Sequence, residues 1–149
     1  MEKLKETRDT IPFRVRMGEV SDLPFIYDSW MQSLKFIYPH KYDKCFSKNY
    51  AKIINILLDK SCSLVAHLEG ERDEILSYLI YTSFEENMVI HFGYTKADCR
   101  REGKLRELLH FANPLLLPVV FTHPAKNENV MEYLCRKFIY DPSIIGLLE

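Results

Sequence analysis

The sequence predicts a single α/β domain with a mixed, mostly antiparallel central sheet and helices on both of its faces. Its 149 residues suit one domain. Its 47% hydrophobic and 28% charged residues are ordinary for a globular protein. The hydrophobic period changes along the chain from helical spacing to alternation and back. The resulting order of elements is β-α-α-β-β-β-α-β-α, with room for a short final strand.

Residues 1–11 are expected to form a flexible tail, and residues 12–149 to form the single domain. The tail is charged (MEKLKETRDT) and carries no apolar signal core after Met1. Pro12–Met17 (PFRVRM) alternates apolar and basic residues, which is typical of a strand.

Two helices are expected after this strand. Ser21 or Asp22 caps the first helix, which runs to about Phe36. The second helix begins at Ser47 and runs to about Asp59. In the first helix the apolar residues recur at helical spacing: Phe25, Ile26, Trp30, Leu34 and Ile37.

Three strands in a meander follow the helix pair. They are expected at Cys62–Leu68, Ile75–Thr82 and Met88–Thr95. Turn residues at Gly70–Asp73 and Glu85–Asn87 separate them. Short turns of this kind join antiparallel neighbours.

The last part of the chain alternates again between helix and strand. Gly103–Ala112 is expected to be helical, Pro118–Thr122 a buried strand and Glu128–Phe138 the last helix. The tail Ile139–Leu148 can supply the final short strand.

Composition argues against several classes of protein. The net charge of -1 gives no support to general nucleic-acid binding. The four cysteines are widely spaced, as in a protein of a reducing cytoplasm, and indicate neither a zinc site nor a disulfide framework. The most apolar run, Phe111–Phe121, is short and broken by prolines, so no membrane span is expected.

The turn between the third meander strand and the next helix carries the strongest chemical signal. A helix N-terminus offers free backbone N–H groups and the positive end of the helix dipole, which together bind phosphate. Gly103 allows a ligand to approach the backbone, and Arg100, Arg101 and Lys104 add positive charge. The alternative is an ordinary surface helix start with solvated charges.

The order of elements and four motifs resemble the GNAT family of acetyl-coenzyme A-dependent N-acetyltransferases. The stretch RREGKL (100–105) is similar to the family's R/Q-x-x-G-x-G/A motif at the start of this helix. RMGEVSD (16–22) resembles the family's entry from the first strand to the first helix. ILSYLIY (75–81) and NENVMEYLCRKF (127–138) resemble its third strand and its late helix. The resemblance covers about residues 12–142.

The resemblance implies an N-acyltransferase that moves an acetyl group from acetyl-CoA to an amine by direct attack. The pantetheine arm is then expected at Tyr94 and Thr95, at the end of the strand. The pyrophosphate is expected over the following turn, at Arg100, Arg101, Gly103, Lys104 and Leu105. The family's helix tyrosine, which protonates the leaving thiolate, corresponds to Tyr133. The alternative for Tyr133 is a core aromatic residue.

The general base is open among several residues. Family members use a glutamate or histidine near the fourth strand, or water. The candidates are His91, Glu85, Glu86 and His123. Histidine titrates near neutral pH, which suits a base. The alternative for His91 is a hydrogen-bonded histidine within the sheet, and for the two glutamates a solvated turn.

The sequence departs from the family's pattern at three positions, and those at Leu105 and Lys137 support a second hypothesis. Leu105 replaces the preferred Gly or Ala, Lys137 replaces the usual Gly before Phe138, and Ser77 stands where Gly is common. The leucine at position 105 indicates a tighter or displaced pyrophosphate loop. The second hypothesis is a catalytically silent GNAT-fold protein that acts by binding a protein partner.

The acceptor is expected near the first helix pair, with no metal involved. Aromatic and polar residues there either shape an acceptor pocket or pack a loop: Trp30, Tyr38, His40 and Tyr42. The expected partner is an amine-bearing small molecule or protein, with the chain a monomer or homodimer. SWMQSL (29–34) and YTK (94–96) also resemble acetyltransferase-like proteins of tailed bacteriophages, which implies a location in the host cytoplasm.

A nucleic-acid contact through the basic side chains near this turn is a third hypothesis. Acidic residues interleave with them and weaken it. The basic residues are Lys96, Arg100, Arg101, Lys104 and Arg106.

Overall fold

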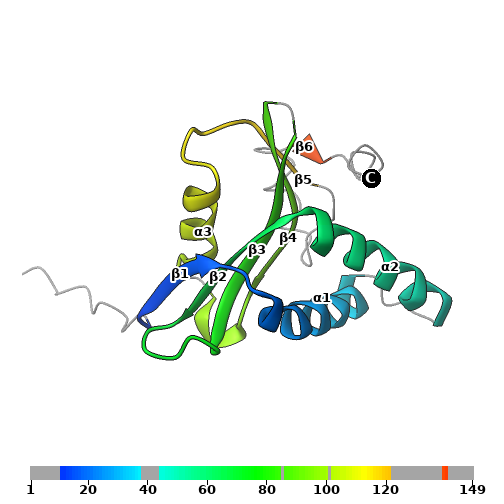
Figure 1. The fold of residues 1–149 in the computed structure, drawn as a ribbon, viewed down its shortest axis with the longest axis horizontal. Helices are drawn as coiled ribbons and strands as arrows, with labels where there is room; N and C mark the ends of the chain where they lie inside the picture. The colour runs from blue at the N-terminus through cyan, green and yellow to red at the C-terminus, as the bar shows by residue number, and fades with distance from the viewer. Residues whose placement is uncertain (1–10, 38–43, 85, 101, 122–138, 141–149) are drawn as a thin grey trace, which may run out of the picture.

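The computed structural model describes residues 11–37, 44–84, 86–100, 102–121 and 139–140. The elements, in chain order (Figure 1), are β1 (Phe13–Met17), η1 (Val20–Asp22), α1 (Leu23–Ile37), α2 (Lys44–Lys60), β2 (Cys62–Leu68), β3 (Ile75–Phe84), β4 (Asn87–Thr95), η2 (Ala97–Cys99), α3 (Lys104–Ala112), β5 (Val119–Phe121) and β6 (Ile139–Tyr140). This order confirms the predicted one and the short final strand. The predicted helix Glu128–Phe138 lies outside the described residues.

The strands form one six-stranded sheet in the order β1-β2-β3-β4-β5-β6. Neighbours from β1 to β4 pair antiparallel. By contrast, β5 pairs parallel with β4, and β6 pairs parallel with β5. A tight turn joins β2 to β3, with Gly70 at φ 85°, whereas the parallel pair β4–β5 needs the long crossover that α3 provides. The predicted mixed, mostly antiparallel sheet is confirmed.

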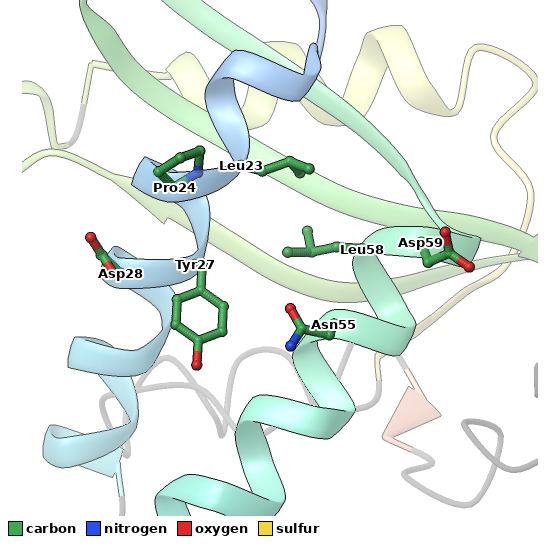
Figure 2. A pocket seen from close by; sticks show the side chains of 7 residues that line it. All are labelled: Leu23, Pro24, Tyr27, Asp28, Asn55, Leu58 and Asp59. Carbon is green, nitrogen blue, oxygen red and sulfur yellow. The ribbon is translucent and has the colours of Figure 1, made fainter.

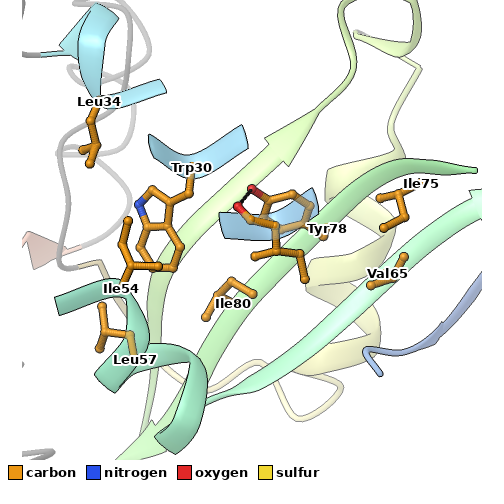
Figure 3. Packing of buried hydrophobic residues seen from close by; sticks show 9 residues of the cluster. Trp30, Leu34, Ile54, Leu57, Val65, Ile75, Tyr78 and Ile80 are labelled. Carbon is orange, nitrogen blue, oxygen red and sulfur yellow. Dashed lines mark hydrogen bonds between the residues drawn. The ribbon is translucent and has the colours of Figure 1, made fainter. Parts of the chain in front are cut away.

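Helices cover both faces of this sheet (Figure 1). On one face, α1 and α2 pack through buried side chains that recur at helical spacing: Ile26, Trp30, Leu34, Ile54 and Leu57. The sheet contributes the residues that alternate onto this face: Val65, Ile75, Tyr78 and Ile80. Figure 3 shows this cluster. Within it, the hydroxyl of Tyr78 donates a hydrogen bond to the carbonyl of Ile26 over 3.1 Å.

α3 covers the opposite face with Leu108, which is fully buried. Its partners are the strand residues that alternate with those of the first cluster: Leu64, Ala66, Leu79 and Met88. The alternation of side chains in β2 and β3 therefore supplies both cores at once.

The entry to α1 differs from the prediction that Ser21 or Asp22 caps the helix. A 3-10 turn precedes α1, and its N-cap residue is Glu19. Asp22 lies three residues further on, where its carboxylate accepts a hydrogen bond from the Glu19 N–H over 2.7 Å. The same carboxylate receives both terminal nitrogens of Arg16, at 2.6 and 2.7 Å. This buried ion pair ties the end of β1 to the start of α1.

Candidate functional site

A turn leads from the end of β4 to the N-terminus of α3. It holds η2 and ends at Gly103, the N-cap residue, with φ 79° and ψ 13°. This left-handed conformation favours glycine. The first helical hydrogen bond runs from the Glu107 N–H to the Gly103 carbonyl over 3.0 Å. The N–H groups of residues 104–106 precede it and face out of the helix end, as an anion site requires.

The space outside this turn is open at Gly103. A Cβ atom built there would meet no atom of the described residues within 4 Å. Arg100 is exposed nearby, and its Nε donates a long hydrogen bond of 3.4 Å to the Thr95 carbonyl. Arg101 lies outside the described residues. A ligand can therefore approach the backbone of the turn at Gly103.

Lys104 points in a different direction from the one expected of a phosphate ligand. Its side chain is fully buried, and its Nζ lies 2.8 Å from Oε2 of Glu102. The same Nζ lies 4.9 Å from the centre of the Phe13 ring in β1. The group that Lys104 offers at the helix mouth is thus its backbone N–H. A contact between its ammonium and a phosphate stays a prediction.

Leu105 packs beneath the helix, against the sheet. A Cβ atom at Gly93 in β4 would lie only 3.1 and 3.2 Å from the two Cδ atoms of Leu105. Leu105 also joins the buried cluster around Leu108. The larger side chain, where the GNAT motif has Gly or Ala, is thus accommodated by the missing side chain at Gly93.

Among the described residues, the end of β4 has one paired edge and one edge without a neighbouring strand, called the open edge below. β5 pairs with β4 only over Met88–Ile90 in the described part of the chain. On the other edge, the Lys96 N–H donates to the Leu76 carbonyl over 2.8 Å. Because backbone groups alternate along a strand, those of Thr95 and Gly93 point away from β3, toward the open edge.

This alternation changes the expected roles of the strand residues. The backbone groups of Tyr94 point toward β3, and its ring stacks on Tyr78 with centroids 5.1 Å apart. The Ser77 hydroxyl donates a hydrogen bond of 2.6 Å to the Tyr94 carbonyl and lies 3.0 Å from Thr95 Oγ1. Gly93, which the sequence reasoning missed, joins Thr95 at the open edge. A glycine within a strand was the available signal, since it often marks a close approach of another group.

His91 lies at a β-bulge in β4. Ile90 pairs with Tyr81, but Phe92 already pairs with Ile80, so the register shifts at His91. His91 is 1% exposed, and its Nε2 lies 2.7 Å from the hydroxyl oxygen of Thr82. The structure therefore has the hydrogen-bonded histidine of the alternative hypothesis. Bulges are common beside active sites, and a role for His91 as base stays a prediction.

Most of the remaining predicted catalytic and acceptor residues lie outside the described chain. This applies to Glu85, His123, Tyr133, Tyr38, His40 and Tyr42. Trp30 is fully buried and stacks on Phe92 with ring centroids 4.9 Å apart and planes at 4°. It belongs to the core, so the interpretation of Trp30 as a lining residue of an acceptor pocket is wrong. Glu86 is exposed and borders a hollow of about 660 Å³ with Leu117.

A groove of about 570 Å³ lies between α1 and α2. Figure 2 shows Tyr27 and Leu23 from α1 and Asn55 and Leu58 from α2 directed toward it. Asp28 and Asp59 stand at its outer margins. The groove belongs to the helix pair on one face of the sheet, whereas α3 and its N-terminal turn belong to the other face.

The part of the chain that the structure describes also bears on a metal site, a membrane span and a nucleic-acid surface. It holds no group of three or more His, Cys, Asp or Glu side chains able to bind a metal. None of its helices is long and apolar enough to cross a bilayer. Of the basic residues near the turn, Lys96 pairs with Glu74, which raises the pKa of Lys96. With Lys104 buried as well, the basic surface expected for a nucleic-acid contact is reduced.

No protein-family model matches the sequence, and no curated protein matches it. Several solved structures share its fold. A putative acetyl transferase from Pyrococcus furiosus has a TM-score of 0.65 at 16% identity, covering 85% of this chain and 93% of the other. The PaiA N-acetyltransferase of Thermoplasma acidophilum, in complex with coenzyme A, has a TM-score of 0.61 at 13% identity, covering 84% and 87%.

An acetyltransferase of the GNAT family from Staphylococcus aureus is similar at a TM-score of 0.59 and 9% identity, covering 84% of this chain and 82% of that protein. At these identities the likeness concerns the fold and not the activity. In each comparison more than four fifths of this chain is covered, so the likeness extends over the sheet and its helices. This chain has the GNAT fold.

Proposed function

We propose that this protein is an acyl-CoA-dependent N-acyltransferase that moves an acetyl group from acetyl-CoA to an amine. The fold, the open edge of β4 and the mouth of α3 support the proposal. The structurally similar protein from Thermoplasma acidophilum was solved with coenzyme A bound.

The observation that carries the proposal is the way the open edge of β4 leads into the mouth of α3. Gly93 and Thr95 direct backbone groups along that edge. The chain then turns at η2 and Gly103, so α3 begins directly beyond the strand. An amide-containing arm that ends in phosphates matches this order, because its amides can pair with a strand and its phosphates with helix N–H groups.

The reaction requires the attacking nitrogen to form a bond to the thioester carbonyl carbon as the carbon–sulfur bond breaks. The nitrogen loses a proton, and the leaving thiolate gains one. Developing charge on the carbonyl oxygen needs a hydrogen-bond donor. Backbone N–H groups on the open edge of β4, next to the bulge at His91, are suitable donors.

Proton transfer is assigned to a small set of residues. Tyr133 is proposed as the acid that protonates the thiolate, by its position in the family motif. His91 and Glu85 are proposed as bases. A buried histidine that shares a hydrogen bond with Thr82 needs access to the amine to act in this way. Water is the alternative base.

The acceptor is proposed to be an amine-bearing small molecule or protein, with the reaction in the cytoplasm. The expectation that the acceptor lies near the first helix pair stays a prediction.

Calorimetry tests the proposal directly. We expect acetyl-CoA and CoA to release heat on titration, and a panel of amines to be acetylated with release of free thiol. The absence of heat at millimolar acetyl-CoA would refute the proposed enzymatic activity. Binding without turnover on any amine would favour the second candidate, a silent GNAT-fold protein that binds a protein partner. The burial of His91 is the observation that favours this second candidate.

A further inference from the structure

Lys104 occupies a position where a lysine is unfavourable. It is the first residue of α3, where the positive end of the helix dipole disfavours a cation. Its side chain is also completely enclosed, and lysine is almost never fully buried unless it is paired. Both costs indicate that the ammonium has a specific task within the fold.

The partner of Lys104 is Glu102, at the same turn. The distance between Nζ and Oε2 is 2.8 Å, and the Glu102 side chain is only 13% exposed. The other carboxylate oxygen accepts a hydrogen bond of 3.3 Å from the Ile11 N–H. The Phe13 ring lies beside the ammonium. These four residues connect the mouth of α3 to the segment that enters β1, and we call them the latch.

The latch includes a carboxylate from the residue next to the turn where a phosphate is proposed to bind. Glu102 directly precedes Gly103, the N-cap residue. The hydrogen bond from Lys104 lowers the pKa of Glu102, so this group is ionised at neutral pH. An ionised carboxylate at the helix mouth would repel the coenzyme's phosphates unless a cation neutralised it.

We infer that Lys104 is a positioning residue that acts through Glu102: it neutralises this carboxylate and so leaves the helix mouth available to the phosphates of coenzyme A. Lys104 is then not itself a ligand of the phosphates. This inference rests on the proposed function, because it assumes that the coenzyme binds at this turn.

The decisive variant is the double substitution Glu102→Gln with Lys104→Met. It removes both charges, and the side-chain oxygen of the new glutamine can still accept the hydrogen bond from the Ile11 N–H. No unpaired buried charge is left, so the variant is expected to fold. We expect its affinity for CoA, measured by calorimetry, to stay within about twofold of wild type, because no uncompensated charge remains. This is a small change on a scale where about 1.4 kcal/mol corresponds to a tenfold change in affinity. A loss of about tenfold or more would show that the ammonium does more than neutralise Glu102, and would overturn the inference.

The single variant Lys104→Met is expected to weaken CoA binding by about tenfold or more, because it leaves the Glu102 charge uncompensated. Pantetheine, which lacks the phosphates, serves as the matched ligand, and its affinity should not change. Salt gives a second readout. Screening should bring the affinity of Lys104→Met closer to wild type as ionic strength rises. A loss of pantetheine binding equal to that of CoA would indicate mere structural damage and contradict the inference.

The outcomes separate the two proposals. If wild-type protein does not bind CoA, the proposed function fails. If wild type binds but the double variant does not, only the role of Lys104 fails. Phe13→Leu is the control for packing. It should lower the unfolding temperature and keep CoA affinity within about twofold, because it changes no charge.

Discussion

The carboxylate of Asp22 illustrates how one residue can organise the entry to a helix. Its two oxygens receive Arg16, and one also receives the backbone N–H of Glu19. Both side chains are less than a tenth exposed. Hydrogen bonding to Arg16 lowers the pKa of Asp22, and the same bond raises the pKa of Arg16. The pair therefore links the stability of the fold to pH.

We expect the pair to make unfolding depend on acid. The pKa of Asp22 is lower in the folded state than its value of about 3.9 in an unfolded chain. Its contribution is therefore fully present above that value and is lost as pH falls through the folded pKa. Urea unfolding between pH 7 and pH 3 measures the loss. Asp22→Asn should show a smaller decrease over this range, and equal decreases in both proteins would contradict the assignment.

Gly103→Glu is expected to abolish coenzyme binding. A carboxylate about 4 Å from a phosphate, at an effective dielectric constant near 20, opposes it by about 4 kcal/mol, which is more than a hundredfold in affinity. Gly70→Glu is the matched control, because Gly70 has φ 85° and equally open surroundings. Both variants should lose about 1–2 kcal/mol of stability from the left-handed backbone. Only Gly103→Glu should fail in calorimetry, and normal affinity would refute the placement of the phosphates.

Tyr133→Phe tests the proposed acid. Removal of the hydroxyl should lower turnover by about 10²–10⁴-fold, the usual contribution of general acid catalysis, and leave coenzyme affinity intact. Steady-state rates and calorimetry on the same preparation separate the two effects. An unchanged rate would remove Tyr133 from the mechanism.

At the scale of elements, α3 and β4 fit together through one unusual pair. Leu105 fills the volume that a side chain at Gly93 would occupy. The pair explains how this chain carries a leucine next to the turn without blocking the helix mouth. It also sets the distance between the strand edge and the helix N-terminus, the two parts of the proposed coenzyme site.

We expect Gly93 and Leu105 to be coupled in stability. Gly93→Ala places a Cβ in contact with Leu105, and overpacking typically costs about 1–3 kcal/mol. Leu105→Ala should cost about 2–5 kcal/mol by leaving a cavity. The double variant should be less destabilised than the sum of the two, by at least about 0.5 kcal/mol in chemical unfolding. Strict additivity would contradict the contact.

At the scale of the whole molecule, one sheet carries helices on both faces, and β4 extends beyond the described residues of its neighbour β5. β4 and β5 pair over only three residues in the described chain. The open edge of β4 is thus held by β3 on one side only. Ser77 and the Lys96 N–H secure that side. A ligand that pairs with the open edge of β4 and reaches the N-terminus of α3 would connect the sheet to this helix.

Coenzyme binding should therefore stabilise the entire domain. A ligand at 100 times its Kd adds about 2.7 kcal/mol to the free energy of unfolding. For a domain of this size each kcal/mol raises Tm by about 2–4 °C, so a rise of about 5–10 °C is expected. Thermal unfolding with CoA measures it, with pantetheine for comparison. No shift at saturating CoA would contradict binding to the folded state.

The sequence alone was sufficient for the order of the described elements, the meander and the glycine at the mouth of α3. These depend on hydrophobic period and backbone preference, which act over a few neighbouring residues. The family resemblance added the coenzyme hypothesis, and the fold supports it.

Only the tertiary structure decided where the charged and aromatic side chains point. Lys104 turns inward because Glu102 binds it and Ile11, 91 residues away from Glu102, completes the latch. Trp30 is in the core because Phe92 stacks on it. His91 is buried because the bulge directs it to Thr82. Each outcome is decided by a contact that forms only on folding, so the local sequence pattern could offer alternatives but not choose between them.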